Sequence, residues 1–468
     1  MIALISSCLA LTLHLSTSQS APELAPRAFP TLPVGSVTPK GWLSAQLNLQ
    51  AEGLSGHLSM FWNDIAASVW IGGTGDGGLH ERTPYWLNGV VPLSFLLENS
   101  KTILPSMSGL YKATHNAPLC QNNTDMRNSD IRDFPTTSAA TCRQECVDDP
   151  ACVAFVINAC TATPHCWLKS SIGTIQSNVS CRCFGKVPPR PLKKVNMTEQ
   201  VETYIQYILS HQNEKGWLGP DSGSMTDGGQ FWGPSNVLQA LYQYAEGRKS
   251  RGDSKSFDNA TLAVRLHLLE QQRRMVTAKL TSWAAARWID MALTAEWLLD
   301  HDDGLQGQNR LKILQLVSML HEDGSDWDSW FETFTGGAGG HNVNNAQGLK
   351  SAAVWYRYNK SVAIAEKRSR ERMYNLDRLY GLPTGMFNGD EILPTPPTRS
   401  PSRGIELCGV VEAMFSYGTM FSVHGDVSFA DRVERIAYVK LFFFIFFVFL
   451  FDASSLNSMF FFFFFLLS

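Results

Sequence analysis

Hydrophobic positions recur with helical spacing along most of the chain. After Asn196, apolar residues stand three or four positions apart at Val201, Ile205 and Ile208. With Glu199 three residues on, this pattern predicts a helix capped by Asn196. Similar amphipathic segments are predicted at about 234–246, 257–275, 285–300, 308–321, 344–357, 362–379, 409–423 and 427–438. Long helices joined by Gly- and Trp-rich loops, without strand alternation, favour an α/α toroid whose loops line a central pocket.

Residues 111–190 depart from the helical pattern. This polar stretch holds eight of the ten cysteines: Cys120, Cys142, Cys146, Cys152, Cys160, Cys166, Cys181 and Cys183. An even number of cysteines in a short polar segment indicates a disulfide scaffold. A metal site is the weaker alternative, because the segment has no Cys-x-x-Cys pair and His165 stands alone.

The spacing Cys142-x3-Cys146-x5-Cys152, followed by Phe155 and by Cys166-Trp167-Leu168-Lys169, resembles a PAN/apple module. The resemblance implies that Cys120 pairs near the end of the module, with Cys181 or Cys183. It also implies a module that hangs from a loop of a larger domain and binds a protein or a carbohydrate without catalysing a reaction.

The two ends of the chain bear on its localisation. Residues 1–20 are predicted to be a secretory signal peptide, since an apolar leader is followed by small polar residues. Asn-x-Ser/Thr sequons agree with secretion and stand at Asn122, Asn178, Asn196, Asn259 and Asn359. The Phe-rich tail, residues 439–468, is interrupted at 452–458, so neither apolar run is long enough to span a bilayer. Thymine-rich DNA encodes Phe, Leu, Ser and Val, so we interpret the tail as an intron read-through or gene-model error, with a membrane anchor as the alternative. A net charge of −3 gives no reason to expect a nucleic-acid partner.

Candidate chemistry is concentrated in residues 381–408. Glu391 lies in this stretch, and Glu406 and Cys408 stand two residues apart. In extended backbone this spacing puts both side chains on one face, where both could reach one metal ion. Zinc accepts carboxylate and thiolate, but two ligands make only half of a tetrahedral site.

Several motifs in order resemble glycoside hydrolase family 127, the β-L-arabinofuranosidase-like proteins. They cover residues 33–438 apart from the cysteine-rich insertion. The motifs are Gly41-Trp42-Leu43, Glu81-Arg82-x-Pro84-Tyr85-Trp86-Leu87, Gly216-Trp217-Leu218-Gly219-Pro220, Gly340-His341-Asn342-Val343, Gly389-Asp390-Glu391, Gly404-Ile405-Glu406-Leu407-Cys408, and Gly425-Asp426 with Asp431-Arg432-Val433-Glu434-Arg435. The resemblance implies an (α/α)6 barrel and a retaining glycosidase in which a zinc-bound Cys attacks the sugar while a Glu protonates the leaving oxygen.

Residue roles follow from the same resemblance. Glu391 matches the acid/base of the family. Asp390 is the alternative, because the interval from Glu391 to Glu406 is one residue shorter than the family's interval. Glu406 and Cys408 match two zinc ligands. The sugar-hydroxyl contacts match His341 and Glu434. Each residue also has a structural interpretation. Glu391 is then a loop carboxylate, and Cys408 is a buried apolar residue. His341 is then a satisfied structural histidine, and Glu434 forms surface ion pairs.

The chain departs from the family in three respects. It lacks the adjacent Cys-Cys pair that supplies the nucleophile and the remaining zinc ligands, and it lacks the β-domains that follow the barrel. Two sugar-binding His positions fall near Asn236 and at 287–290, where this chain has no His. We therefore expect a zinc site that is complete only in a full-length relative, and a substrate that need not be an arabinofuranoside.

These observations predict a signal peptide at 1–20, a barrel domain at 21–110 and 191–438, a PAN/apple-like insertion at 111–190, and an aberrant tail at 439–468. The predicted function is a secreted glycoside hydrolase-like protein that is inactive in this form and has a glycan as its ligand. The alternative is a non-catalytic secreted protein that binds carbohydrate or protein through the PAN/apple-like module.

Overall fold

The computed structural model describes residues 23–98, 120–126, 128–149, 151–158, 163–171, 174–177, 179–186, 196–334 and 340–441. The predicted signal peptide, nearly all of the Phe-rich tail and Cys160 lie outside these residues. The chain divides into two compact units. A helical unit comprises Met1–Ser100 and Val195–Ser468, and a second unit comprises Lys101–Lys194.

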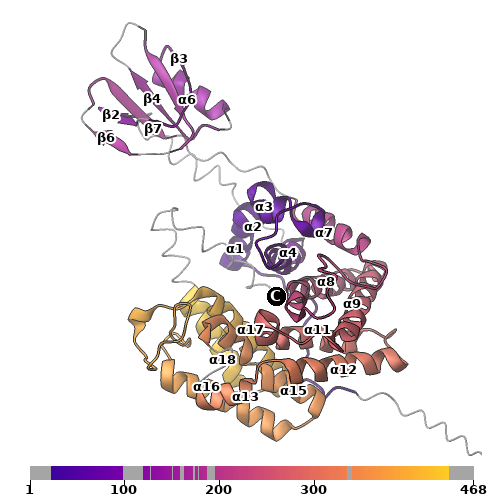
Figure 1. The fold of residues 1–468 in the computed structure, drawn as a ribbon. Coiled ribbons are helices and arrows are strands. Elements are labelled where there is room, and N and C mark those ends of the chain that lie inside the picture. Colours follow the sequence, from indigo (N-terminus) through magenta and orange to yellow (C-terminus); the bar gives the residue numbers. More distant parts are fainter. Residues whose placement is uncertain are drawn as a thin grey trace, which may run out of the picture. The chain divides into compact units, whose positions relative to one another are not determined.

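Two kinds of helix build the helical unit (Figure 1). One kind is buried on nearly every side: α4 (Arg82–Glu98), α8 (Trp232–Ser250), α11 (Trp288–His301), α14 (Asn342–Gly348) and α17 (Leu407–His424). The other kind is mostly amphipathic: α7 (Met197–Ser210), α9 (Ser254–Met275), α12 (Gly307–Asp323), α16 (Val362–Tyr380) and α18 (Val427–Arg435). In α12, for example, the buried residues are Ile313, Leu316, Val317 and Leu320. They form the apolar stripe expected of a helix whose opposite face is exposed to solvent.

The buried helices pack on one another in sequence order, and four of them have an amphipathic partner. Contacts join α4 to α8, α8 to α11, α11 to α14, and α14 to α17. The partners pack as α4 with α7, α8 with α9, α11 with α12, and α17 with α18, while α16 packs on α15 (Ser351–Asn359), which also contacts α11 and α17. The unit is therefore built from pairs of one inner and one outer helix.

Shorter elements complete the helical unit. They are α1 (Gly41–Glu52), α2 (Leu54–Phe61), α3 (Asn63–Ala66), η1 (Val69–Ile71), η2 (Gly228–Phe231), α10 (Ser282–Ala286), α13 (Trp327–Thr333), η4 (Pro401–Arg403) and the π-helical turn η5 (Ile436–Leu441). The predicted cap of α7 is confirmed, because the side chain of Asn196 accepts a hydrogen bond from the backbone N–H of Glu199 at 3.2 Å.

A buried ion network links three of the inner helices. The ammonium group of Lys350 lies 2.8 Å from Asp290 of α11 and 3.8 Å from Glu412 of α17. The amide of Gln347 on α14 donates to both carboxylates, at 2.9 and 3.2 Å. All four side chains are nearly inaccessible to solvent, so the charges compensate one another inside the core.

The second unit is a small disulfide-rich sheet with one helix. A five-stranded antiparallel sheet has the order β1-β7-β4-β5-β3, and β2 pairs with β6 apart from it. The elements are β1 (Gln121–Asn122), β2 (Thr124–Met126), β3 (Asp130–Pro135), α6 (Ala139–Asp148), β4 (Ala154–Asn158), β5 (His165–Lys169), β6 (Ile175–Ser177) and β7 (Arg182–Lys186). Helix α6 packs on β4 and β5, where Phe155, Ile157 and Leu168 form a core.

Disulfides tie this unit together. Cys120 pairs with Cys183, which is one of the two partners that the PAN/apple resemblance implied. Cys142 pairs with Cys166, and Cys146 pairs with Cys152. Cys181 is also in a disulfide. The prediction of a disulfide scaffold is therefore confirmed for the described cysteines of the unit.

Candidate functional site

The loop at 381–408 is docked onto the start of α14. The backbone N–H of Asn342 donates to the carbonyl of Glu391 at 2.8 Å, and the side-chain amide of Asn342 donates to the carbonyl of Gly389 at 2.9 Å. Gly389 has a φ of 149° and packs against the Asn342 side chain, so a Cβ there would be strained and crowded. These bonds hold Glu391 beside His341.

Four of the predicted site residues converge, and we call them the His341 cluster: His341, Glu391, Glu406 and Cys408. His341 lies between the two carboxylates, with Nε2 4.0 Å from Oε1 of Glu391 and Nδ1 3.8 Å from Oε2 of Glu406. The thiol of Cys408 donates to Oε1 of Glu406 at 3.2 Å. Residues from the loop, from the start of α14 and from the start of α17 thus form one group.

The two carboxylates differ in exposure. The Glu391 side chain is 78% exposed, whereas that of Glu406 is 13% exposed. Burial raises the pKa of Glu406 to about 7, and the nearby Glu391 charge adds to the effect. Burial lowers the pKa of His341, with a further contribution from Arg287, so its imidazole is neutral at neutral pH. The cluster therefore offers an exposed carboxylate, a neutral imidazole and a buried carboxyl that titrates near neutrality.

Cys408 is a thiol rather than a thiolate in this arrangement. Burial raises its pKa well above the usual range, and the adjacent Glu406 carboxylate raises it further. Zinc binds thiolate, whereas the Cys408 thiol is protonated. Among the described residues, no group of three or more His, Cys, Asp or Glu side chains is arranged to hold a metal ion. The zinc site stays a prediction about a full-length relative.

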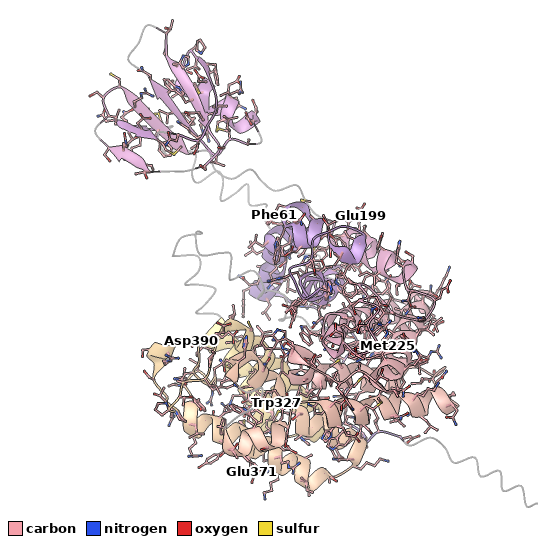
Figure 2. The ribbon with its side chains drawn as sticks, in the orientation of Figure 1. Phe61, Glu199, Met225, Trp327, Glu371 and Asp390 are labelled. Atoms are coloured by element: carbon pink, nitrogen blue, oxygen red, sulfur yellow. A yellow bond between two sulfur atoms is a disulfide. The ribbon has the colours of Figure 1, made fainter. Side chains whose placement is uncertain are left out.

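Two other predicted residues lie apart from the His341 cluster. Asp390 is 61% exposed, forms an ion pair with Arg403 at 3.4 Å, and lies at the periphery of the helical unit (Figure 2). Both carboxylates are exposed, and of the two Glu391 is the one that pairs with His341. The choice between them as acid/base stays a prediction. Glu434 is exposed on α18, and no contact joins it to the cluster within the part of the chain that is described. Its sugar-binding role stays a prediction.

An aromatic and cationic wall adjoins the cluster. The ring of Trp283, on α10, meets the ring of His341 edge to face at 5.3 Å between centroids. Trp283 also lies 4.9 Å from the guanidinium of Arg287, which precedes α11. The sequence pattern did not indicate either residue as functional, because their positions depend on tertiary contacts. The only sequence signal was the absence of histidine at 287–290.

In the second unit, aromatic and charged side chains lie together on β5 and its neighbours. The guanidinium of Arg182 lies 4.4 Å from the ring of Trp167, and the imidazole Nε2 of His165 lies 2.6 Å from Oδ2 of Asp133, within hydrogen-bond distance. Trp167 and Arg182 are partly exposed. A surface of this composition suits contact with a protein or a sugar.

Comparisons with known proteins support one of the two resemblances. The family profile described as PAN domain matches residues 124–169. Neither the curated proteins nor the solved structures contain a match to this chain. The second unit thus contains a PAN domain, a binding module of extracellular proteins, whereas the resemblance to glycoside hydrolase family 127 has no support from these comparisons. Among the described helices, none is long and apolar enough to cross a membrane.

Proposed function

We propose that the helical unit binds a glycan at the His341 cluster and derives from a glycoside hydrolase. The observation that carries this proposal is the convergence of His341, Glu391 and Glu406 beside Trp283. Carboxylates and imidazole bond sugar hydroxyls, and an aromatic face stacks on a sugar ring. These residues are up to 123 positions apart in the sequence, so only the fold brings them together.

The packing of the helices supports the proposed family. An (α/α)6 barrel is a ring of inner helices, each with an outer partner. The order α4, α8, α11, α14 and α17, with α7, α9, α12, α16 and α18 outside them, has this alternation. The His341 cluster lies at the starts of α14 and α17, where loops of such a barrel line its pocket.

We propose that this chain binds its glycan without cleaving it. Glu391 is placed as a solvent-exposed carboxylate that could exchange a proton with a sugar oxygen, and neutral His341 could hold a hydroxyl. The cysteine of the cluster is the protonated, partly buried Cys408, which is a poor nucleophile. Arabinofuranosides and related pentosides are the first ligands to test.

Isothermal titration of the purified chain against a panel of arabinofuranosides, pyranosides and uronides tests the proposal. We expect binding by at least one ligand of the panel, no release of free sugar, and a loss of about tenfold or more in affinity in His341→Ala and Glu391→Gln. Glu371→Gln on α16, which removes one exposed carboxylate elsewhere, should leave affinity unchanged. Equal affinity of His341→Ala and the wild type would refute the location of the site, and no binding to any ligand would refute the function.

A second candidate function rests on the PAN domain. We propose that the face carrying Trp167 and Arg182 binds a protein or carbohydrate partner outside the cell. The disulfides of this unit support an oxidising compartment and therefore secretion. Trp167→Ala should abolish capture of that partner while leaving glycan binding at the His341 cluster intact, and unchanged capture would exclude this face.

A further inference from the structure

Arg287 differs from the other buried arginines of the described chain. The others each pair with a carboxylate: Arg274 with Asp221 and Glu270, Arg357 with Glu296 and Asp300, and Arg372 with Asp328. Arg287 is only 7% exposed, yet no described carboxylate lies within 4.0 Å of its guanidinium. A buried cation without an anionic partner is costly unless something else compensates it.

Neutral groups hold the Arg287 guanidinium in place. Its Nε donates to the side-chain oxygen of Asn344 at 3.0 Å, and Nη1 donates to the hydroxyl of Tyr85 at 3.1 Å. The rings of Trp232 and Trp283 lie 4.6 and 4.9 Å from its central carbon. These contacts fix the orientation of the guanidinium, while the N–H groups of Nη2 have no hydrogen-bond acceptor among the described residues.

The position of Arg287 relates it to the His341 cluster. Trp283 contacts both Arg287 and His341, so the guanidinium and the cluster share one wall. Arg287 is also close enough to act electrostatically on His341, Glu406 and Cys408. A ligand seated against His341 and Trp283 could therefore extend a substituent to the free edge of the guanidinium.

We propose that Arg287 binds a carboxylate carried by the glycan, so that the ligand is an acidic sugar such as a uronide. The proposal rests on the proposed function, because it places the acidic group on the sugar bound at the His341 cluster. A planar guanidinium with two unpaired N–H groups matches a planar carboxylate and binds it more specifically than a lysine ammonium would. The carboxylate would supply the missing anionic partner of Arg287.

Matched ligands test this proposal without any variant. Oligogalacturonides and glucuronides are titrated beside their methyl esters, which keep the sugar ring but remove the charge. We expect the free acids to bind about tenfold or more tightly than the esters. Equal affinities of acid and ester would overturn the carboxylate site while leaving the glycan function standing. Tighter binding of sulfated sugars than of uronides would overturn the assignment to a carboxylate.

Variants then locate the effect. Arg287→Gln should bind acids and esters equally, and Arg287→Lys should keep part of the preference because it keeps the charge but loses the planar fork. Arg378→Gln removes an exposed arginine from α16 and should keep the full preference. Circular dichroism shows whether each variant is folded. A folded Arg287→Gln that still prefers acids would refute the role of Arg287, whereas a failure of acids, esters and neutral sugars alike to bind would refute the proposed function itself.

Discussion

At the scale of single residues, the pairing of Cys408 with Glu406 decides the chemistry of the only free cysteine described. Its thiol is partly buried and donates to a carboxylate, and both desolvation and the neighbouring charge oppose ionisation. We predict that iodoacetamide at pH 8 labels Cys408 in the folded chain more than about tenfold slower than in the urea-unfolded chain, since the thiolate is the reactive form. Mass spectrometry of the tryptic peptides measures both rates. Equal rates would show that the thiol is ionised or open to solvent.

The same pairing predicts poor zinc retention. A protonated thiol and a carboxylate whose oxygens face different partners offer no preformed set of donors. We predict much less than one zinc per molecule after dialysis of the chain against a weak chelator, as measured by inductively coupled plasma spectrometry. Stoichiometric zinc that Cys408→Ser abolishes would contradict this arrangement.

Glu406 should make stability depend on pH. Its pKa is raised from 4.5 to about 7 in the folded chain, so the folded state holds the proton more tightly than the unfolded state. The resulting stabilisation is complete below pH 4.5 and is lost as pH rises towards 7, and it amounts to at most about 3 kcal/mol. We predict that Glu406→Gln gains stability relative to the wild type over this interval, in urea unfolding at each pH. Glu371→Gln serves as the control, and a constant difference for Glu406→Gln would contradict the burial effect.

The sequence could identify the members of the His341 cluster but not their environment. His341, Glu391, Glu406 and Cys408 were found by motif, and the structure brings all four together. Arg287 was missed because its significance depends on the absence of a carboxylate neighbour, which no local pattern records. Neither burial nor the pKa of a carboxyl follows from residue type, so the difference between Glu391 and Glu406 also required the fold.

At the scale of elements, hydrophobic periodicity located the helices well but not their internal breaks. The predicted segment at 344–357 is two helices, α14 and α15, with Lys350 between them. The break places the Lys350 ammonium against Asp290 and Glu412. A hydrophobic pattern cannot show this break, because the apolar residues on both sides of Lys350 keep helical spacing.

The buried network yields a prediction about stability. Lys350→Met would leave two buried carboxyl groups without their cation, so we predict a loss of about 3–5 kcal/mol in the free energy of unfolding. Lys367→Met, which removes a lysine whose side chain is 75% exposed and pairs with Glu371, should cost less than about 1 kcal/mol. Urea unfolding at pH 7 compares the two. Similar losses in both variants would mean that the network contributes little to holding the inner helices together.

At the scale of the whole molecule, the two units have separate cores and separate means of stabilisation. The PAN-containing unit has disulfides and a small sheet core, whereas the helical unit depends on the burial of long helices. The sequence indicated this division because the cysteines are clustered and helical periodicity stops and resumes around them. The partner of Cys120, by contrast, does not follow from sequence spacing, which allows Cys181 or Cys183, and the structure pairs it with Cys183.

A hydrogen bond at the junction makes the division testable. The hydroxyl of Thr198 on α7 donates to the carboxylate of Glu98 on α4 at 3.0 Å, so the two ends of the helical chain lie side by side where the second unit is inserted. A Gly/Ser linker of about six residues can span such a gap without strain.

We predict that replacing residues 101–194 with this linker leaves the melting temperature of the helical unit within about 3 °C of its value in the full chain, by calorimetry. Glycan affinity at the His341 cluster should also be unchanged, because its contacts among the described residues all come from the helical unit. An unfolded product, or a folded product that no longer binds the glycan, would show that the helical unit depends on the inserted one.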